Sequence, residues 1–531
     1  MYIGPKEVQR KSAVSLKNLA PIRSPMYRHN ERQLQFEKFK FVVGGKLRSD
    51  NRWVKLAKQI PWEAIEELYA SSLSGTGKGA PALSVRMALG AMIIKEKLRL
   101  SDEETAEQIR ENPYLQYFLG LKQYEDKAVF HPTMFVHFRK RLPEDIIIRI
   151  NDLIAEKAIS EIEKKTKKDH GKNDAPGTGT KNKGKLLVDA TCAPEDINYP
   201  TDLKLLNNAR EKSEQIIDTL HKAMPKGARK PRTYRQKARQ AFLQVSKSRK
   251  VRQKTLRKAI RRQLGYLKRN LKHIEKQSQT VSLCELSDRQ YKNLLVFSEL
   301  YRQQQWMYDH KSRRIDDRIV SINKPHVRPI KRGKAGADVE FGAKVSASVV
   351  DGFAFVDRIS WDNFNESTDL KDQIEAYRNR FGHFPESVHA DKIYRNRDNR
   401  RYCKKYGIRL SGPKLGRPPK QTDENEAEIK ALKKLARQDE IDRIAIEGKF
   451  GQGKRRYSLG RIMTKLDGTS KTAIVMSFLV MNLERWLKAI FLAFFRLLYR
   501  VYGRHFRAHT CTRARQFVTA WKFQPVFQEV Y

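Results

Sequence analysis

The chain has 531 residues, with 108 lysines and arginines against 60 acidic residues and a formal net charge of +48. This length allows two to four domains and a sizeable core. A charge so far from neutral implies a polyanionic partner, most simply DNA or RNA, whose binding should weaken steeply as salt rises. A ribosome-like or membrane-surface basic protein is the alternative.

Cysteine usage and hydropathy indicate an intracellular chain. The N-terminus lacks the apolar run of a signal peptide, and polar and charged residues divide the most apolar stretch, residues 473–502, into pieces too short to span a bilayer. The four cysteines are scattered, without the spacing of a zinc site: Cys192, Cys284, Cys403 and Cys511. We therefore expect a cytoplasmic protein in a reduced compartment, with no membrane partner.

The first third of the chain is predicted to be mostly helical. Residues 1–50 are polar and basic and predict an irregular arm, whereas apolar residues recur every three to five positions within 51–164 and predict a helical N-terminal domain. Short helices joined by tight turns can present one helix to a DNA groove, but they also occur as plain bundles. Residues 165–185 are rich in Lys, Gly and Thr and predict a flexible linker.

A long basic segment follows the first predicted strand, LLVDAT, which contains Asp189. This insertion covers residues 200–335. Between positions 226 and 276 it has 20 Lys or Arg and one acid, Glu275, while apolar residues keep a stripe at spacings of three to five. The stripe predicts amphipathic helices with a cationic outer face. A solvated helical hairpin is the alternative, but contact with the DNA backbone explains the charge bias better.

The remaining elements predict a mixed α/β domain. Residues 340–362 alternate apolar and polar around an Asp-Gly pair, which indicates a β-hairpin. A helix, a short strand ending on Asp391, a second helix, another short strand and helices carrying Glu447 then follow. Without the insertion, residues 186–484 form one domain with a central sheet, and residues 485–531 form a C-terminal helical tail.

Three carboxylates in this domain suggest metal-dependent chemistry. Asp189 and Asp391 are expected at or near the C-terminal ends of strands, where open α/β sheets place ligands, with Glu447 on a helix packed against that edge. Carboxylates suit Mg²⁺, and two such ions about 3.5–4 Å apart can clamp the oxygens of a phosphodiester displacement. Each carboxylate alone is weak evidence, because similar contexts surround other acids: Asp196, Glu340, Asp351 and Asp362.

Two basic residues accompany Glu447. Arg443 precedes it by four positions and shares its helical face, either as a surface salt bridge or for a DNA contact. Lys454 would share that face, three turns after Arg443, if the helix continued. The glycines at 448, 451 and 453 each cost roughly 1 kcal/mol in a helix, so the spacing allows either a helix that approaches DNA closely or a loop.

At these motifs the chain resembles the DDE transposases of bacterial insertion sequences, of the type with an InsH-like N-terminal domain. The N-terminal part of the resemblance is carried by SDEETAEQIRENPYLQYFLGL and MFVHFRKRL. The catalytic part is carried by LLVDATCAPEDINYPTDLKLLNNAR, VEFGAKVSASVVDGF, SVHADKIYRNRDNR, RIAIEGKFGQGKRRYSLGRI and SFLVMNLERW. It covers most of the chain, except the tail after about Trp486.

The resemblance implies an RNase H-like fold and cleavage and joining of DNA with Mg²⁺ or Mn²⁺, bound as two ions. The family's metal-binding carboxylates carry over onto Asp189, Asp391 and Glu447. A wider Tyr, Arg, Glu, Lys signature is met by Arg443, Glu447 and Lys454, whereas Glu440 stands at the Tyr position. The basic residues expected to contact DNA are Arg443, Lys454, Lys449, Arg455, Lys392 and Arg395.

The function implied is that of a transposase that binds the terminal inverted repeats of its element, cuts the element ends and joins them to target DNA. We expect a homo-oligomer on double-stranded DNA, in the bacterial cytoplasm and associated with the nucleoid. Two alternatives are a transposase-derived DNA-binding regulator without chemistry and a stand-alone nuclease of RNase H type. The presence of all three carboxylates argues against the first, and the helical domain and basic insertion are superfluous for the second.

Overall fold

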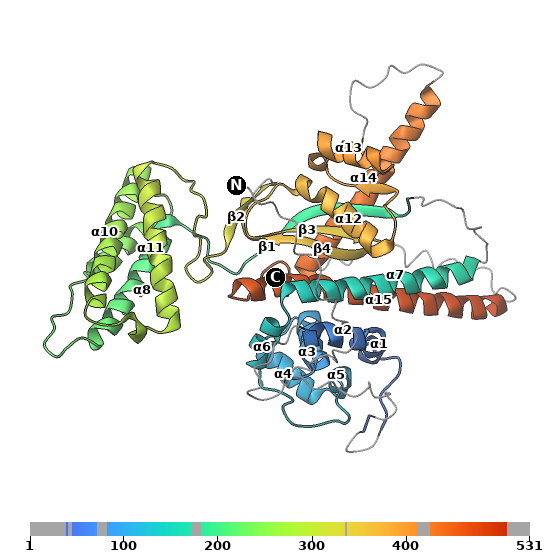
Figure 1. The fold of residues 1–531 in the computed structure, drawn as a ribbon, viewed down its shortest axis with the longest axis horizontal. Coiled ribbons are helices and arrows are strands. Elements are labelled where there is room, and N and C mark those ends of the chain that lie inside the picture. The colour runs from blue at the N-terminus through green and yellow to red at the C-terminus, as the bar shows by residue number, and fades with distance from the viewer. Residues whose placement is uncertain are drawn as a thin grey trace, which may run out of the picture. The chain divides into compact units, whose positions relative to one another are not determined.

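The computed structural model separates into two compact units (Figure 1). The first comprises Met1–Met92 and Asp102–Leu142, and the second comprises Ile93–Ser101 and Pro143–Tyr531. The residues that the structure describes are 39–40, 45–71, 82–170, 182–334, 337–412 and 425–506. Most of the predicted arm, much of the predicted linker and the last 25 residues of the tail therefore lie outside the described residues.

The first unit is helical, which confirms the prediction for this part of the chain. Aromatic rings form much of its core, where Phe118 contacts Trp53 and Trp62 at ring-centroid distances of 5.1 and 5.7 Å. The buried Arg86 guanidinium donates to the backbone carbonyls of Tyr117 and Phe118 at 2.7 and 2.8 Å and so satisfies two oxygens at a helix end. The helices are α1 (Arg52–Gln59), α2 (Trp62–Ser71), α3 (Val85–Leu98), whose end from Ile93 falls in the second unit, α4 (Asp102–Glu111), α5 (Pro113–Phe118) and α6 (Met134–Arg141).

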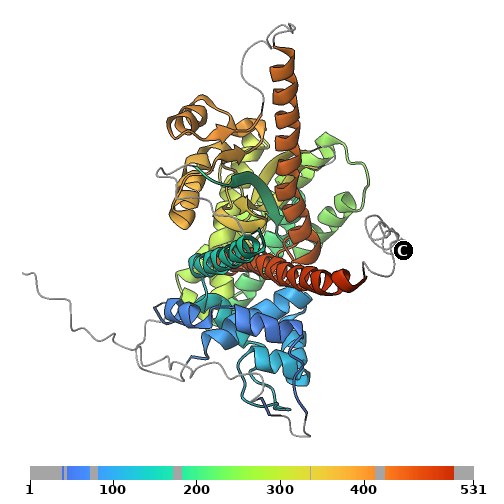
Figure 2. The ribbon, with the colours of Figure 1, turned by 90° about the vertical axis from the view of Figure 1, so that its right-hand side faces the viewer.

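The boundaries of the second unit differ from those predicted. Helix α7 (Glu144–His170) belongs to the second unit, although the sequence assigned most of it to an N-terminal domain of residues 51–164. It runs beside α15 (Asp467–Phe506), which continues across the boundary that the sequence placed at residue 485 (Figure 1, Figure 2). Because each long helix covers apolar surface on the other, neither can be divided between domains.

A buried polar network fixes these two helices to the sheet. The Asn482 amide donates to Asn151 Oδ1 at 2.8 Å and to the backbone carbonyl of Ala354 at 2.7 Å. The Ala354 N–H returns a hydrogen bond to Asn482 Oδ1 at 2.8 Å. All three residues are fully buried, so these bonds orient α7 and α15 on the strand that holds Ala354.

The sheet has six strands and mixed directions. Strand β1 pairs antiparallel with β3 and parallel with β5, and β5 pairs parallel with β6. On its other side β3 pairs antiparallel with β2 and with β4. The strands are β1 (Lys185–Pro194), β2 (Arg328–Lys334), β3 (Ala337–Val350), β4 (Phe353–Ser360), β5 (Ser387–His389) and β6 (Arg409–Leu410). The order β4-β3-β1-β5-β6 is consistent with an RNase H-like fold.

The predicted hairpin is confirmed as β3 and β4. The two residues of its turn, Asp351 and Gly352, have φ angles of 49° and 77°. Two positive φ values are what a two-residue hairpin turn of the primed type requires, and they explain the Asp-Gly pair.

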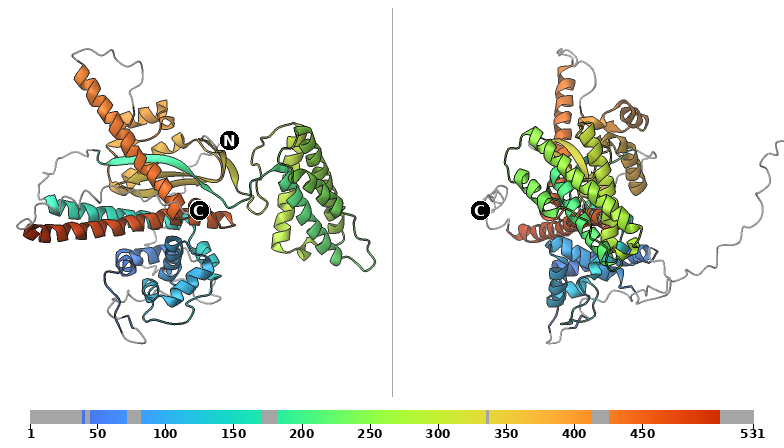
Figure 3. Two further views of the ribbon diagram at one scale, coloured as in Figure 1. Left: turned by 180° about the vertical axis from the view of Figure 1, so that it is seen from behind. Right: turned by 90° about the vertical axis from the view of Figure 1, so that its left-hand side faces the viewer.

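Short helices connect the parallel strands, and a long helix crosses them. These elements are η3 (Glu366–Asp369), α12 (Leu370–Phe381), η4 (Lys392–Tyr394), α13 (Arg397–Lys405) and α14 (Glu426–Arg456). Helix α14 packs on β1 and β5 (Figure 3). Two ion pairs hold it there: Lys185 Nζ of β1 lies 2.6 Å from Asp442, and Arg409 of β6 donates two hydrogen bonds to Asp439 at 2.6 and 2.8 Å.

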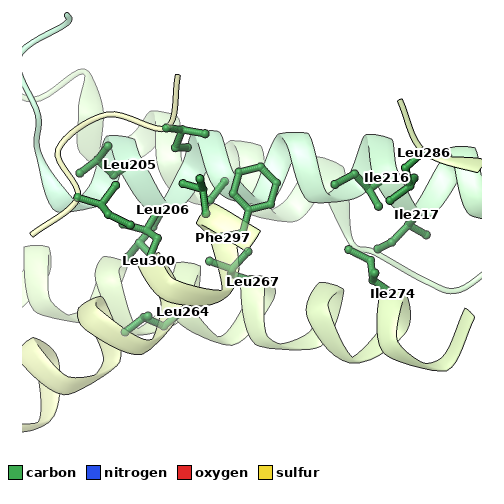
Figure 4. Close-up of a cluster of buried hydrophobic side chains, with 14 of the residues drawn as sticks. Leu205, Leu206, Ile216, Ile217, Leu264, Leu267, Ile274, Leu286, Phe297 and Leu300 are labelled. Atoms are coloured by element: carbon green, nitrogen blue, oxygen red, sulfur yellow. The ribbon is translucent and has the colours of Figure 1, made fainter. Parts of the chain in front are cut away.

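The insertion folds as a helical body with its own apolar core. Its elements are α8 (Asp202–Lys222), α9 (Arg235–Ser246), α10 (Gln253–Ser278), η2 (Leu283–Glu285) and α11 (Asp288–Asp309). Figure 4 shows Leu206, Leu267 and Phe297 from three of these helices meeting in this core. The expected amphipathic helices are confirmed.

A carboxyl group buried in the second unit predicts a pH-dependent stability. Burial raises the pKa of Glu96, which accepts a hydrogen bond from Ser477 Oγ at 3.3 Å, to about 7. The folded pKa lies above the unfolded one, so this group stabilises the fold most below about pH 4.5 and costs stability as pH rises toward 7. We expect Glu96→Gln to raise the free energy of unfolding by about 1–3 kcal/mol at pH 8 and by much less at pH 5. Urea unfolding at both pH values would measure this, with exposed Glu103→Gln as the control; equal effects at both would contradict it.

Within the described part of the chain, no helix combines the length and apolar character that a membrane crossing requires.

Candidate active site

The three predicted carboxylates line one cleft of the second unit. Asp189, Asp391 and Glu447 surround a space of about 530 Å³. Arg443 and Lys454 line it as well. Segments separated by 202 and 56 positions in the sequence therefore contribute acids to a single depression in the surface.

Asp189 lies in the middle of β1 rather than at its end, which corrects the expected position. The strand continues to Pro194 because its antiparallel pairing with β3 extends to Gly342. The parallel pairing with β5 stops earlier, at Leu187 opposite His389. Asp189 thus stands two residues beyond the last parallel pair, at the C-terminal edge of that half of the sheet.

Asp391 occupies the corresponding place after β5. It also lies two residues beyond the last pair, since β5 ends at His389. Its carboxylate accepts a hydrogen bond from the Lys392 N–H at 2.7 Å and caps η4. Equal offsets from paired residues bring Asp189 and Asp391 to the same edge of the sheet.

Glu447 and its two basic companions share one helix. Helix α14 continues through the three glycines to Arg456, so the helical alternative is confirmed and the loop alternative is wrong. Arg443 donates to Glu447 Oε1 at 2.8 Å, and Lys454 Nζ lies 3.7 Å from Glu340. Gly451 lines the cleft, whereas a methyl group at Gly448 would meet no atom within 4 Å.

The surroundings of Asp189 disfavour its charged form. Burial is the largest cause that raises the pKa of Asp189, to about 6, and nearby Glu366 and Glu447 raise it further. The Ala190 N–H, which donates to Asp189 Oδ1 at 2.8 Å, and Arg443 lower the pKa but do not compensate. A carboxyl group in this condition gains from any cation that enters the cleft.

Glu366 is a fourth acid of the cleft that the sequence did not reveal. It lies in the first turn of η3, and its carboxylate is 3.2 Å from Lys344 Nζ. Asn399 holds this turn beside η4, because its amide donates to the carbonyls of Ser367 and Tyr394 at 2.7 and 2.9 Å. The only sequence signal is a polar segment, NES, after a hairpin, which many turns share.

The other basic residues predicted to contact DNA do not line this cleft. Lys449 lies near Arg485 and Lys488 of α15, and burial together with these cations lowers its pKa to about 8. Arg455 and Lys392 are exposed beyond the cleft, and Arg395 packs near Gly412.

The acids suit a hard divalent cation in chemistry but do not enclose one. Among the described residues, no three His, Cys, Asp or Glu side chains lie close enough together to hold a metal ion. Oxygen donors are nevertheless what Mg²⁺ and Mn²⁺ prefer, and a bound cation would offset part of the cost of burying the Asp189 charge.

Two models of known protein families match parts of this chain. A model described as "Transposase DDE domain" matches residues 388–484, which include Asp391, Arg443, Glu447 and Lys454, and a "Transposase domain (DUF772)" model matches residues 42–141. The two matches indicate a DDE transposase of insertion-sequence type. The second match covers the helical unit of the transposase, while Asp189 and the insertion lie outside both matches.

One curated relative matches part of the chain. The transposase is 28% identical over 155 residues to "Uncharacterized protein ORF8 in nfe locus" from Rhizobium meliloti. The match spans 29% of the transposase and 66% of that protein. No solved structure matches the chain.

Proposed function

We propose that this transposase binds the terminal inverted repeats of an insertion sequence and catalyses metal-dependent cleavage and strand transfer of DNA. The convergence of Asp189, Asp391 and Glu447 with Arg443 and Lys454 in one cleft carries this proposal. In an RNase H-like fold, which the strand order supports, such a site would lie where β1 and β5 diverge.

The carboxylates would hold the metal, as Mg²⁺ or Mn²⁺ and as two ions. Asp189, Asp391 and Glu447 are the proposed ligands. The ions, when bound, would supply activation of the attacking hydroxyl and stabilisation of the leaving oxygen. Arg443 and Lys454 place positive charge along the same side of α14, where they would bind backbone phosphates and orient the strand.

The rest of the chain supplies affinity for DNA in this proposal. The helical unit would recognise the element ends, and the cationic faces of α9 and α10 would contact the backbone. Since two ends must be held together, we propose a homo-oligomer on DNA, associated with the bacterial nucleoid. The residues Lys449, Arg455, Lys392 and Arg395 would contribute outside the cleft.

The alternatives differ in the substrate that they require. A regulator derived from a transposase would bind the ends without cutting them, and an RNase H-type nuclease would prefer RNA–DNA hybrids. The four acids of the cleft and the basic insertion favour cleavage of DNA ends over both.

A comparison of substrates tests the proposal. We expect the purified full chain with Mg²⁺ to cut duplex DNA carrying the inverted repeats that flank its gene, and to lose this activity when EDTA removes the ion. A scrambled repeat and an RNA–DNA hybrid of the same length serve as controls. Preferential cleavage of the hybrid, or tight binding of the repeats without cleavage at any Mg²⁺ or Mn²⁺ concentration, would contradict the proposal.

A further inference from the structure

The helical insertion contains a pocket of about 840 Å³ that the proposed chemistry does not use. It opens where α8 and α10 begin and where α9 and α11 end, and the segment after α11 completes its wall. This size lies within the range of about 300–1,000 Å³ typical of pockets that hold small organic groups.

The wall of the pocket is apolar and partly exposed. Phe242, Leu256 and Tyr308 contribute from three different helices, and each keeps part of its surface accessible. Ile260 and Tyr308 also pack on the core of the insertion, which makes this side of the wall rigid. A flat apolar group could therefore lie against it without displacing the core.

The rim of the pocket is strongly cationic. Six of the residues that line the pocket are basic, and the one acid, Asp202, is already engaged by Arg318 at 2.7 Å and by the Gln304 amide at 2.9 Å. Within the described residues, no carboxylate pairs with these members of the rim: Lys204, Arg249, Lys311 and Arg313. The rim therefore presents positive charge that only an external anion can neutralise.

One contact shows how the wall and rim are combined. The Arg257 guanidinium lies 4.2 Å from the centre of the Tyr308 ring and donates to the Tyr308 carbonyl at 2.9 Å. This fixes a planar cation on an aromatic face inside the pocket. Guanidinium and aromatic planes are the surfaces on which unpaired bases stack.

We propose that this pocket binds an unpaired nucleotide of a DNA strand, with the base against the apolar wall and its phosphates at the cationic rim. A duplex cannot place a stacked base there, so the strand must be open, as it is at a cut end. The proposal rests on the proposed function to the extent that DNA is the partner. An inorganic phosphate would leave the wall uncovered, and an apolar ligand would leave the rim unneutralised.

Binding measurements in EDTA, where no cleavage occurs, test this proposal. The probes are a fluorescein-labelled 20-base-pair duplex, the same duplex with a three-nucleotide overhang, and an overhang that contains 2-aminopurine. A duplex of this length spans about two turns of DNA. We expect wild type to bind the overhang about tenfold more tightly than the duplex, and to quench 2-aminopurine by stacking.

Matched variants locate the effect. Phe242→Leu keeps apolar volume but removes the ring, and should abolish the tenfold preference and the quenching while leaving duplex binding unchanged. Arg249→Gln, on the exposed rim, should weaken overhang binding more than duplex binding. This variant keeps the test informative if circular dichroism shows that Phe242→Leu is unfolded. Tyr291→Leu removes an exposed aromatic ring of α11 that does not line the pocket, and should retain both properties.

Three results would overturn the proposal. The first is equal binding of duplex and overhang by wild type, and the second is a preference for the overhang that survives both pocket variants. The third is complete displacement of the overhang by free deoxyadenosine monophosphate at the concentration at which the nucleotide itself binds. Duplex binding separates this failure from that of the proposed function. If the pocket is wrong, wild type still binds and, with Mg²⁺, cuts duplex ends; if the proposed function is wrong, that cleavage is absent.

Discussion

Replacing Asp189 by Asn or Glu447 by Gln is expected to lower Mg²⁺-dependent cleavage of element ends by about 1,000-fold or more, equivalent to about 4 kcal/mol of lost transition-state stabilisation. Each change removes a negative charge from the cleft but preserves the shape of the side chain. Duplex binding should stay within about threefold of wild type, because neither residue lies on α9 or α10, whose cationic faces are proposed to contact the DNA backbone. Single-turnover cleavage and fluorescence anisotropy measure the two quantities.

The matched control is an acid in a similar sequence context outside the cleft. Asp362 lies two residues after the end of β4, as Asp391 lies two residues after the end of β5, but it is exposed and does not line the cleft. Asp362→Asn should cleave at the wild-type rate. If either Asp189→Asn or Glu447→Gln cleaves as fast as Asp362→Asn, the assignment of these carboxylates is wrong.

Glu366 provides a graded comparison within the same assay. Its charge is already paired with Lys344, so Glu366→Gln removes less uncompensated negative charge than Asp189→Asn does. We interpret Glu366 as an acid that shapes the potential at Asp189, and the smaller loss expected from its neutral variant follows from that pairing.

The sequence predicted those parts of the fold that local pattern determines. The Asp-Gly turn, the alternation beside it and the amphipathic stripe of α10 each follow from the geometry of a single element, and all three are present. The carboxylates could be selected because strand ends and helix spacing constrain where a chain can place acids. The continuation of α14 through its glycines was undetermined, since the cost of glycine is offset by packing on β1 and β5, which the sequence does not display.

What the sequence missed depends on contacts between distant segments. Glu366 enters the cleft because Lys344 and Asn399, from other elements, hold its turn. Helix α7 looked like the last helix of the N-terminal domain, but its apolar face packs on α15, more than 300 positions later. Asp189 looked like a strand-end residue because the extent of β1 is set by its partner β3, beyond the insertion.

A buried ion pair where the insertion joins the sheet gives the second large expected effect. Lys324 Nζ contacts the Glu195 carboxylate and donates to the Ile462 carbonyl at 3.1 Å, with both charged side chains at most 5% exposed. Burial is the largest influence on the pKa of Glu195 and raises it, although Lys324 acts to lower it. The pair joins three segments: the end of β1, the return from the insertion and the segment after α14.

We expect Lys324→Met to lower the free energy of unfolding by about 3–5 kcal/mol, because it leaves the Glu195 carboxylate buried without its counter-ion. Adding Glu195→Leu to that variant should restore most of the loss, since two apolar side chains of similar size need no hydration. The exposed pair of Arg461 and Asp196, at 2.6 Å, is the control, and Asp196→Asn should cost less than about 1 kcal/mol.

Urea unfolding followed by circular dichroism measures these three changes. A double variant as unstable as Lys324→Met would show that the pair contributes net stability, which would contradict the dominance of lost hydration. If instead the double variant is stable but cleaves element ends more slowly, the pair acts through geometry. It fixes where the chain leaves and re-enters the sheet, and Glu195 lies six residues after Asp189 and seven before the start of α8.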